Sequence, residues 1–83
     1  MDRDEIRDEI YVKLTNIFRE NFDDDSIKIN DNTTAKDIED WDSLEQINLI
    51  SRIEKVFNIK FDIKETLTLH NVGEMVSLIS TKL

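Results

Sequence analysis

The sequence has 83 residues, which is enough for one small domain with a single hydrophobic core. Leu, Ile, Val and Phe supply 27 of them, well above the level typical of disordered chains. The net charge is −8, and residues 1–45 hold 15 acids against six bases. The negative electrostatic field of these charges repels nucleic acid and anionic membrane surfaces, so a basic protein is the favoured partner.

Cysteine and proline are absent, and Gly73 is the only glycine. The chain therefore has no disulfide framework or thiolate metal site, and its composition favours helices over a turn-rich β fold. No apolar run approaches the roughly 20 residues of a membrane span, and the opening "MDRDEIRDEI" lacks the apolar core of a signal peptide. These features predict a cytoplasmic protein.

The first predicted helix covers about residues 3–20. Acidic residues dominate its opening turns, where the helix dipole favours them. Its apolar residues recur at helical spacing and form one stripe, made of Ile6, Ile10, Leu14, Ile17 and Phe18 and widened by Tyr11.

Residues 21–41 show no sustained period and are rich in Asp, Asn, Ser and Thr. Since connections in compact domains are typically about 4–6 residues long, either a short helical turn lies within this segment or the loop is retained for a purpose. The segment does not fit a calcium loop. Counted from Asp23, the required glycine is Lys28, and counted from Asn30, the closing glutamate is Trp41.

The strongest helical pattern is "DSLEQINLISRIEKVF", residues 42–57. Its start is marked twice, because Asp42 with Glu45 and Ser43 with Gln46 both have capping-box spacing. Either register places Ser43 at or within the first turn. The apolar stripe of this helix comprises Leu44, Ile47, Ile50, Ile53 and Phe57, widened by Leu49 and Val56.

A connector with a short helix near residues 62–68 follows. The last helix opens at Asn71, with Glu74 three residues later as in a capping box. Its apolar face comprises Val72, Met75, Val76, Ile79 and Leu83. The predicted fold is all-α: a small antiparallel bundle of three main helices plus a short fourth, formed by residues 1–83 as one domain, with Ile59 and Phe61 sealing one end.

Ser43 is the residue that most needs an explanation, because a nucleophilic serine requires a neighbouring base. The only histidine, His70, lies in a polar turn where a surface or capping role is expected, and no G-x-S-x-G elbow is present. A hydrolase is therefore rejected. Five acids and no base lie between residues 37 and 45, so the residues alone fit a helix cap or a phosphorylation site. Trp41 is expected to be half-buried, with a partner contact as the alternative.

Three blocks of the sequence resemble the acyl carrier protein family. "DSLEQINLISRIEKVFNIKF" resembles its modification-site helix, "DNTTAKDIEDWDSL" the loop leading to that site, and "NVGEMVSLI" its last helix. Together they span roughly residues 5–82. The resemblance implies that a phosphopantetheinyl transferase attaches 4′-phosphopantetheine from coenzyme A to Ser43, with Asp42 and Leu44 as the matching motif neighbours. It would explain why Ser43 has no base and why cysteine is absent, since the working thiol belongs to the cofactor.

The resemblance further implies a free-standing, monomeric acyl carrier protein that catalyses nothing itself. It would carry acyl intermediates as thioesters to loading and transferring enzymes with basic docking patches, and we expect Glu45 and Glu54 to contact them. Fatty acid biosynthesis is the general setting. Asn48, Arg52 and Lys55 dilute the acidity of the helix, and Asp40 stands where many members have glycine. These departures favour a dedicated pathway.

Two alternatives stay open at this point. A peptidyl or aminoacyl carrier would use the same chemistry with another cargo. An acidic, non-enzymatic helical adaptor would instead use Ser43 as a helix cap or phosphosite, with Glu45 and Glu54 as solvated surface charges.

Overall fold

The computed structural model describes residues 3–83, so Met1 and Asp2 lie outside the described residues. The described part contains helices and no strand, and the helices are α1 (Arg3–Asn21), a 3₁₀ helix η1 (Ala35–Asp37), α2 (Ser43–Phe57), α3 (Ile63–Leu67) and α4 (Val72–Lys82). The predicted all-α fold, with three main helices and a short fourth, is confirmed. No helix within residues 3–83 is both long and apolar enough to cross a membrane.

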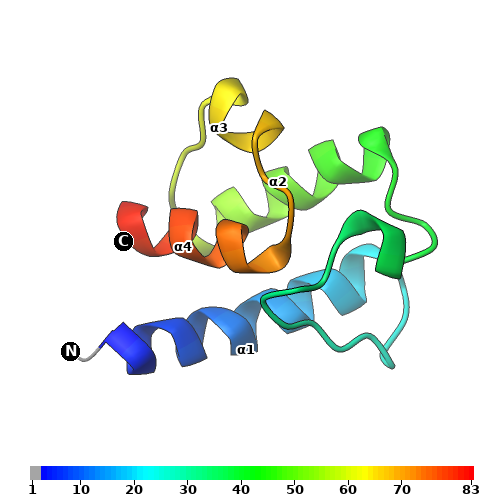
Figure 1. Ribbon diagram of the computed structural model, residues 1–83, viewed down its shortest axis with the longest axis horizontal. Helices are drawn as coiled ribbons and strands as arrows, with labels where there is room; N and C mark the ends of the chain where they lie inside the picture. The colour runs from blue at the N-terminus through cyan, green and yellow to red at the C-terminus, as the bar shows by residue number, and fades with distance from the viewer. Residues whose placement is uncertain (1–2) are drawn as a thin grey trace.

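Helix α1 is the element around which the others are arranged. Both α2 and α4 run in the opposite direction to α1 (Figure 1), and α1 packs closely along each of them. By contrast, α3 packs closely against no other helix of the described chain and stands beyond α4 as a separate turn (Figure 1). The bundle therefore has three well-packed helices and one short helix at its edge.

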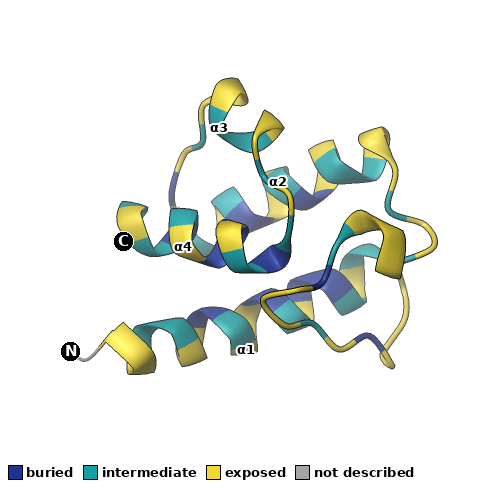
Figure 2. Cartoon of the chain, viewed as in Figure 1, coloured by how far each residue is buried: buried dark blue, intermediate teal, exposed yellow. Residues whose placement is uncertain are grey.

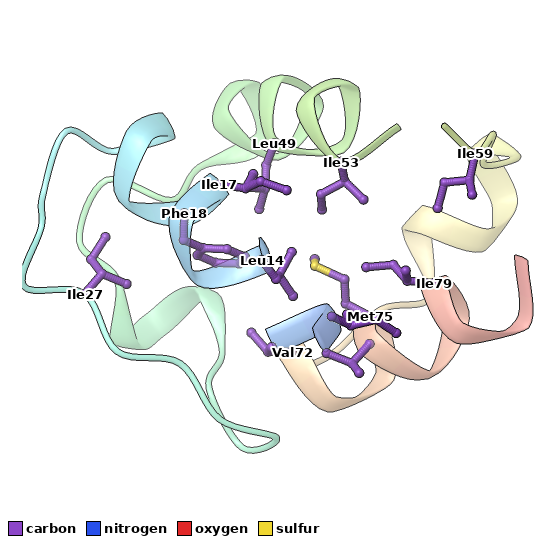
Figure 3. Packing of buried hydrophobic residues seen from close by; sticks show 12 residues of the cluster. Leu14, Ile17, Phe18, Ile27, Leu49, Ile53, Ile59, Val72, Met75 and Ile79 are labelled. Carbon is purple, nitrogen blue, oxygen red and sulfur yellow. The ribbon is translucent and has the colours of Figure 1, made fainter. Parts of the chain in front are cut away.

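The core forms where α1, α2 and α4 face one another. Figure 2 shows buried residues on the facing sides of these helices and exposed residues on their outer sides. Leu14, Ile53 and Met75, one from each helix, converge in the middle of this core (Figure 3). Its buried members are Ile10, Leu14, Ile17, Phe18, Leu49, Ile53, Val72, Met75, Val76 and Ile79, joined by Ile27 and Ile59 from the connecting segments.

The apolar stripe predicted on α2 is only partly buried. Leu49 and Ile53 are inaccessible, whereas Leu44 and Ile47 are 65% and 67% exposed. The reason is geometric: the apolar arc of α2 is wider than the surface that α1 and α4 cover, and α3 does not pack closely against the remainder. Ile59 and Phe61, which were predicted to close one end of the bundle, differ in burial: Ile59 is buried, whereas Phe61 is only half-buried.

The long segment between α1 and α2 is fastened to the bundle by backbone hydrogen bonds. The N–H of Val72 donates to the carbonyl of Thr33 at 2.9 Å, and the N–H of Gly73 donates to the carbonyl of Asp31 at 3.1 Å. Its 3₁₀ helix begins with a capping box between Thr34 and Asp37. The first alternative predicted for this segment, a short helical turn, is therefore confirmed.

Candidate functional site

Ser43 is the first residue of α2, and its side chain is exposed. The preceding Asp42 is the N-cap: its carboxylate accepts a hydrogen bond from the N–H of Glu45 at 2.8 Å, and its carbonyl accepts one from Gln46 at 2.9 Å. The structure thus selects the first of the two registers that the sequence allowed. The Ser43 hydroxyl forms no hydrogen bond with any residue between 3 and 83, so its oxygen is available at the start of a helix.

A largely apolar groove of about 890 Å³ runs between α2 and α3, and Ser43 lies on its border. Buried Met75 reaches it from α4. One wall comes from α2 and the residues before it, including Trp41, Ser43, Gln46, Ile47, Ile50 and Glu54. The other wall comes from α3 and its flanking connectors, including Phe61, Ile63, Thr66, Leu67, Leu69 and His70.

Trp41 holds the chain in place just before Ser43. Its ring meets that of Phe18 edge-on, with centroids 5.2 Å apart, and its indole N–H donates to the side-chain oxygen of Gln46 at 2.6 Å. The expected half-buried position of Trp41 is therefore confirmed. Because the same side chain borders the groove, it connects the core to the surface next to Ser43.

The two glutamates expected to contact partners lie on different sides of α2. The Glu45 carboxylate faces α1 and accepts hydrogen bonds from the side-chain amides of Asn21 and Asn48, each at 3.1 Å. The Glu54 carboxylate borders the groove and accepts a hydrogen bond from the N–H of Phe61 at 2.9 Å. Both side chains are half-buried. The structure therefore places Ser43, Asp42 and Glu54 along the groove, and leaves Glu45 and exposed Leu44 outside its lining.

His70 borders the same groove as Ser43, but no hydrogen bond joins the two residues in the described chain. Its backbone N–H donates to the Glu74 carboxylate at 2.8 Å, while the Glu74 N–H donates to the Asn71 side chain at 2.8 Å. These bonds form the predicted start of α4. His70 thus belongs to a helix-capping arrangement.

The second wall of the groove was not predicted from the sequence. Ile63 and Leu67 of α3 are 78% and 76% exposed and were not assigned any role. Their spacing of four residues on a short helix is the signal that could have found them, because it places both on one face without enough length to join the core.

Comparison with known proteins identifies the family. The model of the phosphopantetheine attachment site matches residues 12–79. The solution NMR structure of holo acyl carrier protein from Geobacter metallireducens is 46% identical, with a TM-score of 0.82, and the match covers 87% of this chain and 83% of that chain. The crystal structure of acyl carrier protein from Thermotoga maritima is 20% identical and supports the fold alone, with a TM-score of 0.83 over 98% of this chain and 94% of that one. No curated protein matches.

The residues at the start of α2 fit a phosphopantetheine group. A phosphate is well accommodated at the N-terminus of an α-helix, where backbone N–H groups and the dipole favour negative charge. The exposed Ser43 hydroxyl occupies that position on the fifteen-residue α2, with an apolar groove beside it. The chain belongs to the acyl carrier protein family, and the prosthetic group with which it works is phosphopantetheine.

Proposed function

We propose that Ser43 is the residue to which phosphopantetheine is attached. The observation that carries this proposal is an exposed hydroxyl, free of hydrogen bonds, at the first position of α2 and on the border of the groove. Asp42 positions it by capping the helix through Glu45, so the serine backbone is fixed while its side chain is free.

Attachment is a phosphoryl transfer performed by a separate Mg²⁺-assisted transferase. The Ser43 oxygen forms a bond to the phosphorus that bears pantetheine, and a base of the transferase takes the serine proton. The pyrophosphate bond of coenzyme A breaks, and 3′,5′-adenosine bisphosphate leaves with the bridging oxygen. The chain supplies the acceptor and catalyses no step itself. Once bound, the group supplies a terminal thiol that carries cargo as a thioester.

The apolar lining of the groove favours an acyl chain as cargo over a charged aminoacyl group. Each methylene that leaves water for an apolar site gains about 0.8 kcal/mol, whereas a buried charge must find a partner. The exposed Ile47 on one wall and Leu67 on the other offer that apolar surface. A peptidyl or aminoacyl carrier, which uses the same attachment chemistry, is therefore the less favoured alternative.

We further propose that the chain works as a cytoplasmic monomer that visits enzymes with basic docking patches. Exposed Glu39 and Asp40 lie just before Ser43 and supply negative charge next to the attachment point. Glu45 and Glu54 stay predicted contacts, each with a hydrogen bond inside the fold as well. Arg52 lies on the exposed side of α2, 3.9 Å from Glu20, and this mixed charge supports a dedicated pathway over general fatty acid biosynthesis.

Intact mass measurement tests the attachment. The purified protein is incubated with coenzyme A, Mg²⁺ and a broad-specificity phosphopantetheinyl transferase. We expect the mass to rise by one phosphopantetheine unit in the natural sequence and to stay unchanged in Ser43→Ala. Ser51→Ala is the matched control, because Ser51 is another exposed serine of α2 that borders the groove, and it should be modified like the natural protein.

Two results would contradict the proposal. Modification of Ser43→Ala would place the attachment elsewhere. A natural protein that stays unmodified, although folded, would favour the acidic adaptor, with Ser43 as a helix cap or phosphosite.

A further inference from the structure

Helix α3 forms a wall of the groove although little holds it there. It has five residues and no buried side chain, which is far shorter than the roughly 12–15 residues that an independent helix needs. Its hydrogen bonds are local: Glu65 and Thr66 donate to the carbonyl of Asp62, and Asp62 donates back to the Glu65 carboxylate at 2.9 Å. On either side, Phe61 and Leu69 pack against the core and anchor the ends of the segment.

Among the hydrogen bonds and ion pairs of the described chain, only one formed by Lys82 joins α3 to another helix. The ammonium group of Lys82, in the last turn of α4, lies 2.9 Å from the Glu65 carboxylate. It also lies over the ring of Phe61, 5.7 Å from the centroid. Lys82 does not line the groove, whereas Phe61 does, so it supports that wall from outside.

The Lys82–Glu65 pair is the most sheltered of the ion pairs among residues 3–83. Its side chains are 24% and 29% exposed, against 49% and 73% for Arg52 and Glu20. The N–H of Asp62 and then Lys82 lower the pKa of Glu65 below its ordinary value, so the carboxylate stays charged at neutral pH. The same oxygen of Glu65 accepts the hydrogen bond from the N–H of Asp62 at the start of α3 and forms the ion pair with Lys82 of α4.

We propose that Lys82 is a positioning residue for the cargo groove. Through its contacts with Glu65 and Phe61, here called the latch, it holds α3 in place as the second wall of the groove. When these contacts break, α3 is free to move away from α2. The inference rests on the proposed function, in which this groove receives the cargo. Since Ile63 and Leu67 line the groove from α3, the latch controls how much apolar surface the cargo meets.

Amide hydrogen exchange of the unmodified protein tests the latch without any cargo. Lys82→Met keeps most of the side-chain length and removes the charge. We expect exchange at Glu65 and Thr66 to rise roughly threefold to fivefold, as for loss of a good partly exposed ion pair, while exchange at Leu49 and Ile53 of α2 stays unchanged. Glu65→Gln should have a similar effect, and the double variant should add little to either.

Lys60→Met is the matched control, because Lys60 is exposed near α3 and has no side-chain partner in the described chain. It should leave exchange in α3 unchanged. Unchanged exchange at Glu65 and Thr66 in Lys82→Met would overturn the proposal. An equal rise in α2 would also overturn it, because the pair would then stabilise the whole fold.

A second measurement connects the latch to the cargo. The protein is loaded with an octanoyl thioester, and cleavage by hydroxylamine is followed by intact mass. We expect cleavage to be roughly threefold faster in Lys82→Met and unchanged in Lys60→Met, since a displaced wall exposes the thioester. Equal rates in all three proteins would overturn the role in cargo shelter. A failure of Ser43 to accept the arm would instead refute the proposed function, while the exchange result would stand.

Discussion

The Asp31 carbonyl oxygen lies so close to Gly73 that it would crowd the first atom of any side chain there. The N–H of Gly73 donates to this oxygen at 3.1 Å, and a Cβ added to Gly73 would lie 2.9 Å from it. Gly73 is in the first turn of α4 with ordinary helical backbone, so the requirement is close approach rather than an unusual φ. This contact closes the long segment before α2 onto the last helix.

Gly73→Ala tests that contact through two opposing effects. Alanine favours a helix by up to about 1 kcal/mol over glycine, whereas overpacking against backbone costs about 1–3 kcal/mol. We expect a net loss of about 1 kcal/mol in the free energy of unfolding, measured by urea denaturation. Ser51→Ala, at an exposed helical position, should change stability by less than about 0.5 kcal/mol. A more stable Gly73→Ala protein would show that the segment yields easily.

The Tyr11–Asp31 pair predicts how stability depends on pH. The Tyr11 hydroxyl donates to the Asp31 carboxylate, and burial followed by this hydrogen bond raises the pKa of Tyr11 from 10.0 to about 12. The folded protein therefore holds the phenolic proton more tightly than the unfolded chain does. Its contribution to stability is complete below about pH 10 and is lost as the pH rises towards 12. The chain has one tyrosine, so phenolate absorbance reports this titration directly.

Tyr11→Phe should remove this alkaline loss and cost about 1 kcal/mol at neutral pH. The substitution should also change how stability depends on pH in the acidic range. The Tyr11 hydrogen bond is the main cause that lowers the pKa of Asp31, so the natural protein loses this stabilisation as the pH falls below the ordinary value of 3.8. A variant with unchanged pH dependence at both ends, followed by thermal unfolding, would contradict the assignment.

Asp42 is predicted to act as a helix cap beside Ser43. Asp42→Ala should lower the free energy of unfolding by about 1 kcal/mol, because the N–H of Glu45 loses its acceptor, whereas Asn should retain most of the stability as a good capping residue. Chemical denaturation measures this difference. If alanine and asparagine were equally destabilising, the charge of Asp42 rather than its capping bond would be responsible.

Trp41 should contribute more to stability than its half-buried position suggests. Trp41→Ala removes the edge-on contact with Phe18 and the bond to Gln46, and we expect a loss of about 2 kcal/mol in urea denaturation. Gln46→Ala removes the hydrogen bond alone and should cost about 1 kcal/mol or less. Equal losses in both variants would assign the effect to the hydrogen bond.

The attached arm is predicted to move freely on its own domain. A phosphate at a helix N-terminus gains about 0.3–1 kcal/mol, whereas each nearby carboxylate opposes it by roughly 0.6 kcal/mol at about 7 Å in water. Asp42 and Glu45 therefore offset the gain, and Asp42 already occupies one of the free N–H groups. Phosphorus NMR relaxation should report a phosphate more mobile than the backbone of α2. Motion as slow as that backbone would show a pinned arm.

The sequence by itself determined the helices and most of their ends, and it singled out Ser43 as the proposed attachment residue. Apolar periodicity placed α1, α2 and α4, and short polar signals such as Asn71 with Glu74 marked where they begin. These are local properties, because a cap and a helical repeat involve residues within a few positions of one another. The blocks that resemble the carrier family were likewise contiguous in sequence.

Only the tertiary structure decided which apolar residues of α2 are buried and which line the groove. Leu49 and Ile47 are equally apolar, but one faces α1 and the core, while the other borders the open space towards α3. The same holds for charges: Glu65 and Lys82 are seventeen residues apart, and no pattern in the sequence pairs them. Burial and ion pairing depend on how helices pack across long separations, which a local pattern does not specify.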